Sequence, residues 1–134
     1  MDYLKLTDLL TGKNISGYYR EYCNTQWYSK EQMIDYQLRK LRSLISHCFV
    51  NVPYYTRIMN EGGINPNAVK SLDYLKQFPV LTKELIKKHY VDFIPLNEQR
   101  LRGIRSSQTG GTTGNILNKR NDAYESIKGL SYAR

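Results

Sequence analysis

The chain has 134 residues, 40% of them hydrophobic, and its Lys and Arg residues exceed its Asp and Glu residues by 20 − 12 = 8. This length accommodates one domain with a core, and no apolar run approaches the roughly 20 residues of a bilayer-spanning helix, so we expect a cytoplasmic protein without a membrane span. The excess of positive charge favours anionic partners such as nucleotides, coenzyme A, nucleic acid or acidic lipid headgroups.

The N-terminal 95 residues divide into two predicted segments. Residues 1–28 are rich in tyrosine and broken by Gly12 and Gly17, and we predict irregular structure there with a short helical turn. Residues 29–95 are predicted to be helical. Their first element, "SKEQMIDYQLRKLRSLISHCFVN", starts with Ser29 and Gln32 at capping-box spacing. Apolar residues recur along it at helical spacing, which predicts an amphipathic helix ending before Pro53: Ile34, Leu38, Leu41, Ile45 and Cys48.

Three shorter helices are predicted after Pro53. The stretch "PYYTRIMNEGG" has Pro53 in its first turn and Gly62 or Gly63 as its stop, and the following Asn65-Pro66 pair predicts a turn. Ser71 is placed to cap "LDYLKQF", and Thr82 is placed to cap "KELIKKHY".

The pattern changes in the third segment, residues 96–134. "LRGIRSS" and "NILNK" are short extended candidates on either side of a Gly/Thr-rich loop, and "DAYESIKGLSYAR" has helical spacing. The predicted fold class is therefore α/β, in which a mainly helical N-terminal segment precedes the first strands and a helix of a larger core.

The loop at residues 108–115 carries the strongest functional signal. Gly110, Gly111 and Gly114 allow the backbone to approach a ligand closely, and Thr109, Thr112 and Thr113 add hydroxyl donors, which is the chemistry of a phosphate cradle. Neither the G-x-G-x-x-G nor the Walker A pattern matches. Residue spacing leaves a second interpretation open, a glycine-rich turn between two strands.

A family resemblance favours the phosphate cradle. The segment Thr109–Gly114, "TGGTTG", resembles the phosphate-binding signature of the acyl-adenylate-forming ligases. Residues 47–66 and 71–90 resemble the helical N-terminal region of phenylacetate-CoA ligase and of CapK-type capsular polysaccharide biosynthesis proteins. The resemblance extends from about Gln37 to the C-terminus, with these signatures in the same order.

The resemblance implies ATP, Mg²⁺ and coenzyme A as cofactors and substrates. In the family reaction a carboxylate attacks the α-phosphate of ATP, and a thiol then displaces AMP from the acyl-adenylate. The loop residues Thr109–Gly114 would hold the β- and γ-phosphates. The sequence departs from the family pattern at Asn115 and Ile116, where Lys and Pro are common, and the chain is much shorter than the family's proteins. We therefore expect an incomplete ligase that is inactive alone, with unknown catalytic residues, and that self-associates through an exposed sheet edge.

The alternative hypothesis is a non-catalytic basic module that binds nucleic acid or a protein partner, of which nucleic acid is the less favoured. Other reactive side chains receive structural interpretations. His47 and His89 lie beside apolar helix residues, which favours hydrogen-bonded structural histidines over a catalytic base. Cys48 lies on the apolar stripe, where a thiol is buried and inert. The cysteines lack metal-ligand spacing, so we expect no metal site, and Asp92 has no partner visible in the sequence.

Overall fold

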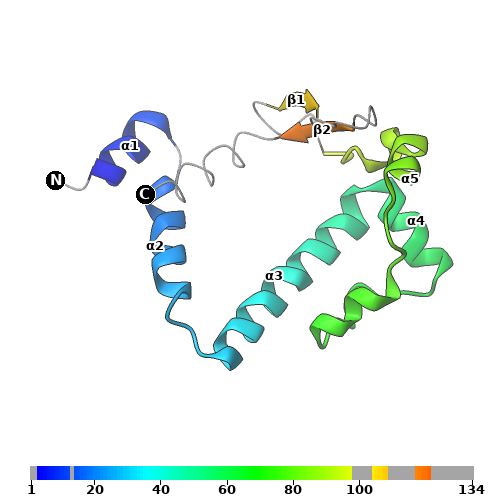
Figure 1. The fold of residues 1–134 in the computed structure, drawn as a ribbon, viewed down its shortest axis with the longest axis horizontal. Coiled ribbons are helices and arrows are strands. Elements are labelled where there is room, and N and C mark those ends of the chain that lie inside the picture. The colour runs from blue at the N-terminus through cyan, green and yellow to red at the C-terminus, as the bar shows by residue number, and fades with distance from the viewer. Residues whose placement is uncertain (1–2, 13, 98–103, 109–116, 122–134) are drawn as a thin grey trace. The chain divides into compact units, whose positions relative to one another are not determined.

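The computed structural model describes residues 3–12, 14–97, 104–108 and 117–121 (Figure 1). The chain divides into two compact units. The central unit consists of residues 30–100, and the terminal unit consists of residues 1–29 together with residues 101–134. The central unit contains an apolar core between its helices, and the terminal unit contains the first two helices and the two strands.

Helix α3 (Lys30–Asn51) is the long amphipathic helix that the apolar spacing predicts. In its apolar stripe Leu41 and Ile45 are buried, and Leu38 and Cys48 pack against the margin of the core. Ile34, the first residue of the stripe, is exposed. The stripe therefore meets the core along the later turns of the helix. The helix ends at Asn51, as Pro53 predicts.

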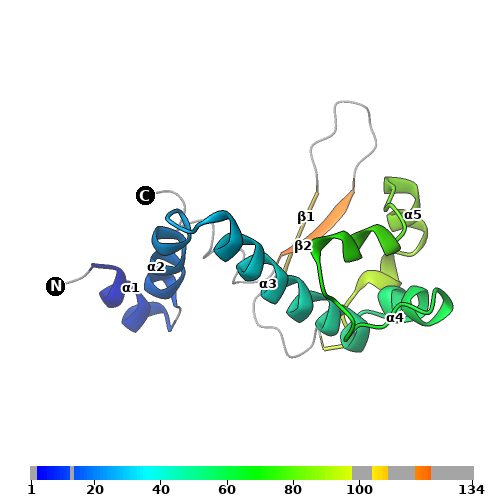
Figure 2. The same ribbon diagram turned by 90° about the horizontal axis from the view of Figure 1, so that it is seen from below.

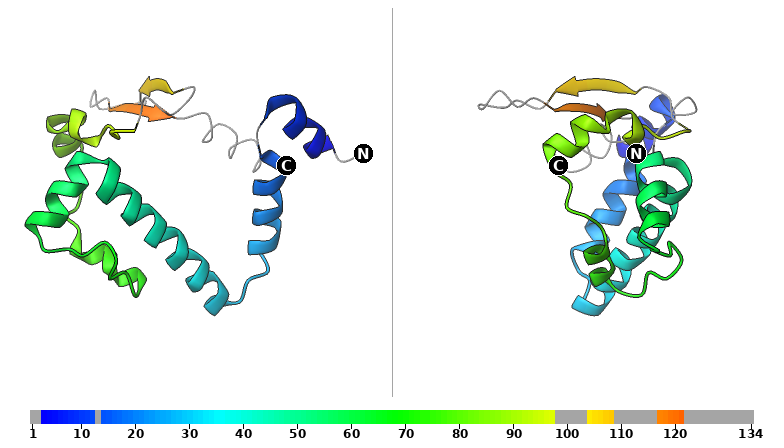
Figure 3. Two further views of the ribbon diagram at one scale, coloured as in Figure 1. Left: turned by 180° about the vertical axis from the view of Figure 1, so that it is seen from behind. Right: turned by 90° about the vertical axis from the view of Figure 1, so that its right-hand side faces the viewer.

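Helix α4 (Pro53–Glu61) packs against α3 and confirms the second predicted helix (Figure 3). Val52 is extended, and Pro53 opens the first turn, where a missing backbone N–H costs nothing. Gly62 is the C-terminal cap, and Gly63 has a φ of 63°, a conformation that glycine adopts without strain. The chain thereby reverses and returns Ile64 to the core.

The structure contains the turn predicted at Asn65-Pro66. Three short helical elements follow it: η1 (Leu72–Gln77), α5 (Lys83–Lys88) and η2 (Tyr90–Phe93). Thr82 caps α5 as predicted, since its side chain accepts a hydrogen bond from the Leu85 amide at 3.2 Å. The predicted Ser71 cap is wrong. The side chain of Ser71 makes no capping hydrogen bond, and the element that follows it is a 3₁₀ helix.

The core of the central unit lies where α3, α4 and the segment after α4 meet. Its buried members are Leu41, Ile45, Met59, Ile64, Val69 and Tyr74. Met59 is the most enclosed of them, with 1% of its surface exposed. The Tyr74 hydroxyl donates a hydrogen bond to the Asn65 carbonyl, so its ring is buried without leaving a polar group unpaired. Arg42 adds a second link by donating from Nε to the Val69 carbonyl at 2.9 Å.

The described part of residues 1–28 contains two helices, α1 (Tyr3–Thr11) and α2 (Ile15–Thr25). The prediction of irregular structure in this segment is therefore wrong. Gly12, with a φ of 65°, makes the turn between them. The Asp8 carboxylate accepts hydrogen bonds from the amides of Ile15 and Ser16, with closest distances of 2.6 and 3.1 Å. These amides have no partner inside α2, and the carboxylate therefore stabilises its first turn. Hydrogen bonding from the Ser16 side chain, together with these amides, lowers the pKa of Asp8.

Two antiparallel strands, β1 (Arg105–Gln108) and β2 (Asn118–Asn121), overlap the described parts of the two segments predicted to be extended, residues 101–107 and 115–119. The described residues are thus mostly helical with a two-stranded sheet, which is consistent with part of a mixed α/β fold. The adenylate-forming core, the segment boundaries at residues 28 and 95 and the self-association stay predictions, and the predicted C-terminal helix lies outside the described residues. None of the described helices combines the length and apolar character needed to cross a membrane.

Candidate functional site

The paired strands β1 and β2 lie directly before and after the predicted phosphate loop in the sequence. In their register Arg105 pairs with Asn121 and Gln108 pairs with Asn118, and Nε2 of Gln108 donates to the side-chain oxygen Oδ1 of Asn118 at 3.3 Å. Figure 2 shows the two strands side by side in yellow and orange. Residues 105–108 and 118–120 are exposed. The Gly/Thr loop therefore connects two adjacent antiparallel strands whose side chains are open to solvent.

The candidate phosphate-binding residues themselves, Thr109, Gly110, Gly111, Thr112, Thr113 and Gly114, lie outside the described residues. The structure thus contains the strands on either side of the predicted site, while the phosphate-binding role of the loop stays a prediction. Both earlier interpretations, a phosphate cradle and a plain turn, are compatible with strands at these positions.

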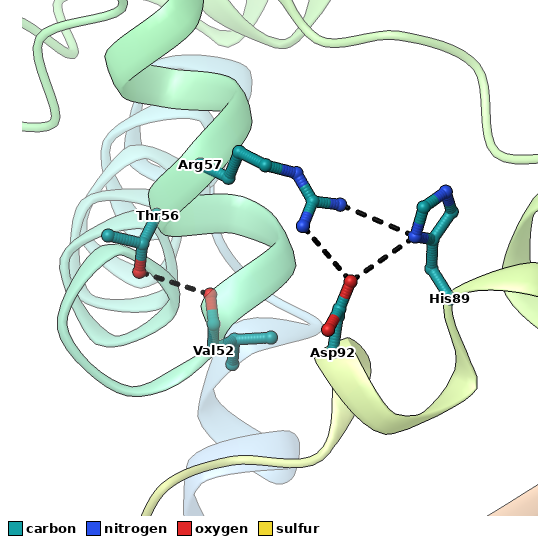
Figure 4. A network of polar contacts seen from close by, with 5 residues as sticks. All are labelled: Val52, Thr56, Arg57, His89 and Asp92. Carbon is teal, nitrogen blue, oxygen red and sulfur yellow. Dashed lines mark hydrogen bonds and ion pairs between the residues drawn. The ribbon is translucent and has the colours of Figure 1, made fainter.

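A second polar cluster lies in the central unit, where α4 meets η2 (Figure 4). Arg57 of α4 pairs with Asp92 of η2, with 3.0 Å between Nη1 and Oδ2. The same carboxylate oxygen lies 3.2 Å from Nδ1 of His89, the C-cap residue that follows α5. Arg57 Nη2 approaches that Nδ1 atom to 3.4 Å. The three side chains therefore connect α4, the end of α5 and η2.

Asp92, for which the sequence shows no partner, pairs with both Arg57 and His89 in the structure. Hydrogen bonding from the Arg57 guanidinium, and secondly from His89, lowers the pKa of the Asp92 carboxyl. Arg57 and Asp92 are 35 residues apart, and nothing in the local sequence pattern indicates their contact. Sequence reasoning therefore missed Arg57, although it interpreted His89 correctly as a hydrogen-bonded histidine.

The contacts of His89 restrict its chemistry. Its Nδ1 atom can carry a proton and donate to Asp92, or be unprotonated and accept from Arg57, but it cannot do both. Tyr54 packs beside this group, with its ring stacked on Phe93 at a centroid separation of 4.2 Å and with the Arg57 guanidinium over it at 5.6 Å. The cluster therefore joins packed elements of the fold, and we interpret it as structural.

The lowered pKa of Asp92 predicts how stability depends on pH. A carboxyl whose pKa is depressed by folding contributes stability above its ordinary pKa, and that contribution is lost as the pH falls through the folded-state pKa. Asp92→Asn should therefore lower the urea midpoint near pH 7, and the difference from the wild type should shrink below about pH 4. Urea unfolding across this range tests the prediction. Asp73→Asn is the control, because Asp73 forms an exposed ion pair with Lys76. A constant difference down to pH 2.5 would contradict an electrostatic role for Asp92.

Cys23 and Cys48 are both free thiols. Cys48 is half-buried, and burial raises the pKa of its thiol. Because the thiolate is the reactive form, a raised pKa makes Cys48 a poor nucleophile. Within the described ranges, no group of three His, Cys, Asp or Glu side chains is placed to hold a metal ion.

An open apolar groove of about 410 Å³ lies between α3 and η1 in the central unit. It is lined by Tyr36, Gln37, Lys40, Leu41, Leu44, Leu72 and Leu75. The Lys40 ammonium lies 5.2 Å from the centroid of the Tyr36 ring. The lining residues include no carboxylate or imidazole.

Comparison with known proteins finds similarity to one kind of enzyme. The phenylacetate-coenzyme A ligase of Aromatoleum evansii is 30% identical over 86 residues, which is 64% of this chain and 19% of that enzyme. The Thermus thermophilus enzyme of the same name is 28% identical over 85 residues, or 63% of this chain and 19% of its own length. The Escherichia coli enzyme is 28% identical over 87 residues, or 64% of this chain and 20% of its own length.

The chain spans about a fifth of the length of the curated relatives that it matches. No family model matches it. The similarity supports the ligase resemblance seen in the sequence, while the resemblance to CapK-type proteins stays a prediction.

Proposed function

We propose that this chain is the N-terminal part of an ATP-dependent acyl-adenylate-forming ligase of the phenylacetate-CoA ligase or CapK type. The observation that carries this proposal is the similarity to three phenylacetate-coenzyme A ligases. The pairing of β1 with β2 on either side of the Gly/Thr loop is consistent with it. Adenylate formation from a carboxylate, followed by thioester formation with coenzyme A, is the corresponding reaction.

In this proposal the loop holds the phosphate chain of ATP. The backbone amides of Gly110, Gly111 and Gly114 would donate to phosphate oxygens, assisted by the hydroxyls of Thr109, Thr112 and Thr113. Mg²⁺ would offset charge on the phosphates while bound mainly to their oxygens and to water, which is how this ion commonly binds nucleotides. Arg105 and Lys119 on the flanking strands are the kinds of side chain that suit this anion.

The proposal includes a limit on activity. The sequence contains no recognisable adenine pocket, acyl pocket or lysine-bearing lid of the family, so we propose that the 134 residues bind phosphate weakly and do not catalyse adenylation alone.

Titration with pyrophosphate tests the loop in the whole chain. We expect the amide signals of Gly110, Gly111 and Gly114 to shift with pyrophosphate more than with sulfate at matched ionic strength. Gly111→Val should abolish the shifts because a side chain blocks close approach, whereas Thr112→Ser should preserve them because the hydroxyl remains. Two-dimensional NMR provides the measurement.

Two outcomes would contradict the phosphate cradle. Loop amides that stay unchanged by pyrophosphate would leave the segment as a plain turn between strands. A larger response to a single-stranded oligonucleotide than to pyrophosphate would favour the basic binding module instead.

A further inference from the structure

The strand register divides the hairpin side chains between two faces. Residues directly opposite each other in an antiparallel pair share a face, as do residues two apart along a strand. The Arg105 face consists of Arg105, Ser107, Lys119 and Asn121. The Arg120 face consists of Ser106, Gln108, Asn118 and Arg120. Consecutive basic residues of β2, Lys119 and Arg120, therefore lie on opposite faces.

The two faces differ in charge. Arg105 and Lys119 are diagonal neighbours on the Arg105 face, a relation that places backbone positions about 7–8 Å apart. Arg120 is the only cation of the other face, where the Gln108 and Asn118 side chains hydrogen-bond to each other at 3.3 Å. Neither strand contains an acidic residue. The Arg105 face thus has twice the formal positive charge of the Arg120 face.

Neither face provides apolar packing. The two strands read "RSSQ" and "NKRN", without an apolar side chain, and seven of the eight residues are exposed. A two-stranded hairpin is marginally stable by itself and ordinarily depends on an apolar face to pack. A hairpin of this composition is suited instead to a charged ligand.

We propose that the Arg105 face binds adjacent phosphate groups of a polyphosphate ligand. Arg105 and Lys119 would each contact a phosphate, and the Ser107 hydroxyl, directly opposite Lys119, would donate a hydrogen bond to the same chain. This inference rests on the proposed function, since it extends the phosphate site of the loop onto the strands. In this proposal Lys119 would supply the cation that the ligase signature commonly has after its last glycine, where this chain has Asn115.

The register provides matched variants for the test. Arg105→Gln, Lys119→Gln and Arg120→Gln each remove one positive charge from an exposed strand position, but Arg120 lies on the other face. We expect the first two variants to weaken pyrophosphate binding by the whole chain about tenfold or more, since each removes a charge-assisted contact. Arg120→Gln should weaken it less than about threefold, and Lys119→Arg should retain binding.

Binding is measured by calorimetry, with monophosphate as the second probe, and NMR follows the loop amides. Two phosphate contacts predict that pyrophosphate binds more tightly than monophosphate. Equal weakening by all three Gln variants would overturn the face assignment, as would equal affinity for the two probes. The proposed function survives that result if the loop amides still shift. If Arg105 and Lys119 matter while the loop amides stay unchanged, the strand site stands and the loop site fails. Absence of pyrophosphate binding by the wild type overturns both.

Discussion

Replacing Met59 by alanine should lower the free energy of unfolding of the central unit by about 2–5 kcal/mol, the usual cost of truncating a fully buried large side chain. Met59 is 1% exposed and lies in the core formed by α3, α4 and the segment that follows them. The loss combines the apolar contacts of the side chain with the cavity that it leaves, because the surrounding groups on three segments relax only partly. Urea unfolding followed by circular dichroism gives the measurement.

The control for Met59 is Val50→Ala on α3, where the side chain is 65% exposed and the change should stay within about 0.5 kcal/mol. Met59→Leu keeps the volume and should cost less than about 1.5 kcal/mol. A similar loss for Met59→Ala and Val50→Ala would show that Met59 is not enclosed. If Met59→Ala does not fold, the folded Met59→Leu variant still measures how closely the site is packed.

Replacing Tyr54 by alanine should lower the free energy of unfolding by about 3–5 kcal/mol, because a large buried aromatic ring is lost. Tyr54 is 3% exposed. Its ring stacks on Phe93 and lies 5.5 Å from the Tyr55 ring in an edge-to-face arrangement. Tyr54→Phe keeps these ring contacts, so it should cost much less than the alanine change.

Hydrogen exchange separates a local role of Tyr54 from general destabilisation. Within and after η2, the Asp92 amide bonds to the His89 carbonyl at 2.9 Å and the Leu96 amide bonds to the Asn51 carbonyl at 2.7 Å. Tyr54→Ala should speed exchange at these two amides more than at the buried Ile45 position of α3. Equal acceleration at all three positions would contradict the interpretation that Tyr54 holds η2 against α4.

Periodicity and helix-ending residues let the sequence alone predict much of the central unit. The apolar repeat of α3, Pro53 at the start of α4 and the Thr82 cap of α5 act over four residues or fewer, and each is found in the structure. The strands on either side of the Gly/Thr loop were also predicted from local composition. Such features can be predicted from the sequence because the backbone conformation there depends on residues that are close together in the chain.

Interactions between distant residues required the tertiary structure. Asp8 stabilises the start of α2 from seven residues away, and without that contact the N-terminal segment reads as irregular. Arg57 reaches Asp92 across 35 residues, where chain spacing carries no information about proximity. The hairpin register likewise assigns Lys119 and Arg120 to opposite faces, because side chains alternate along a strand and only the pairing shows which cation joins Arg105.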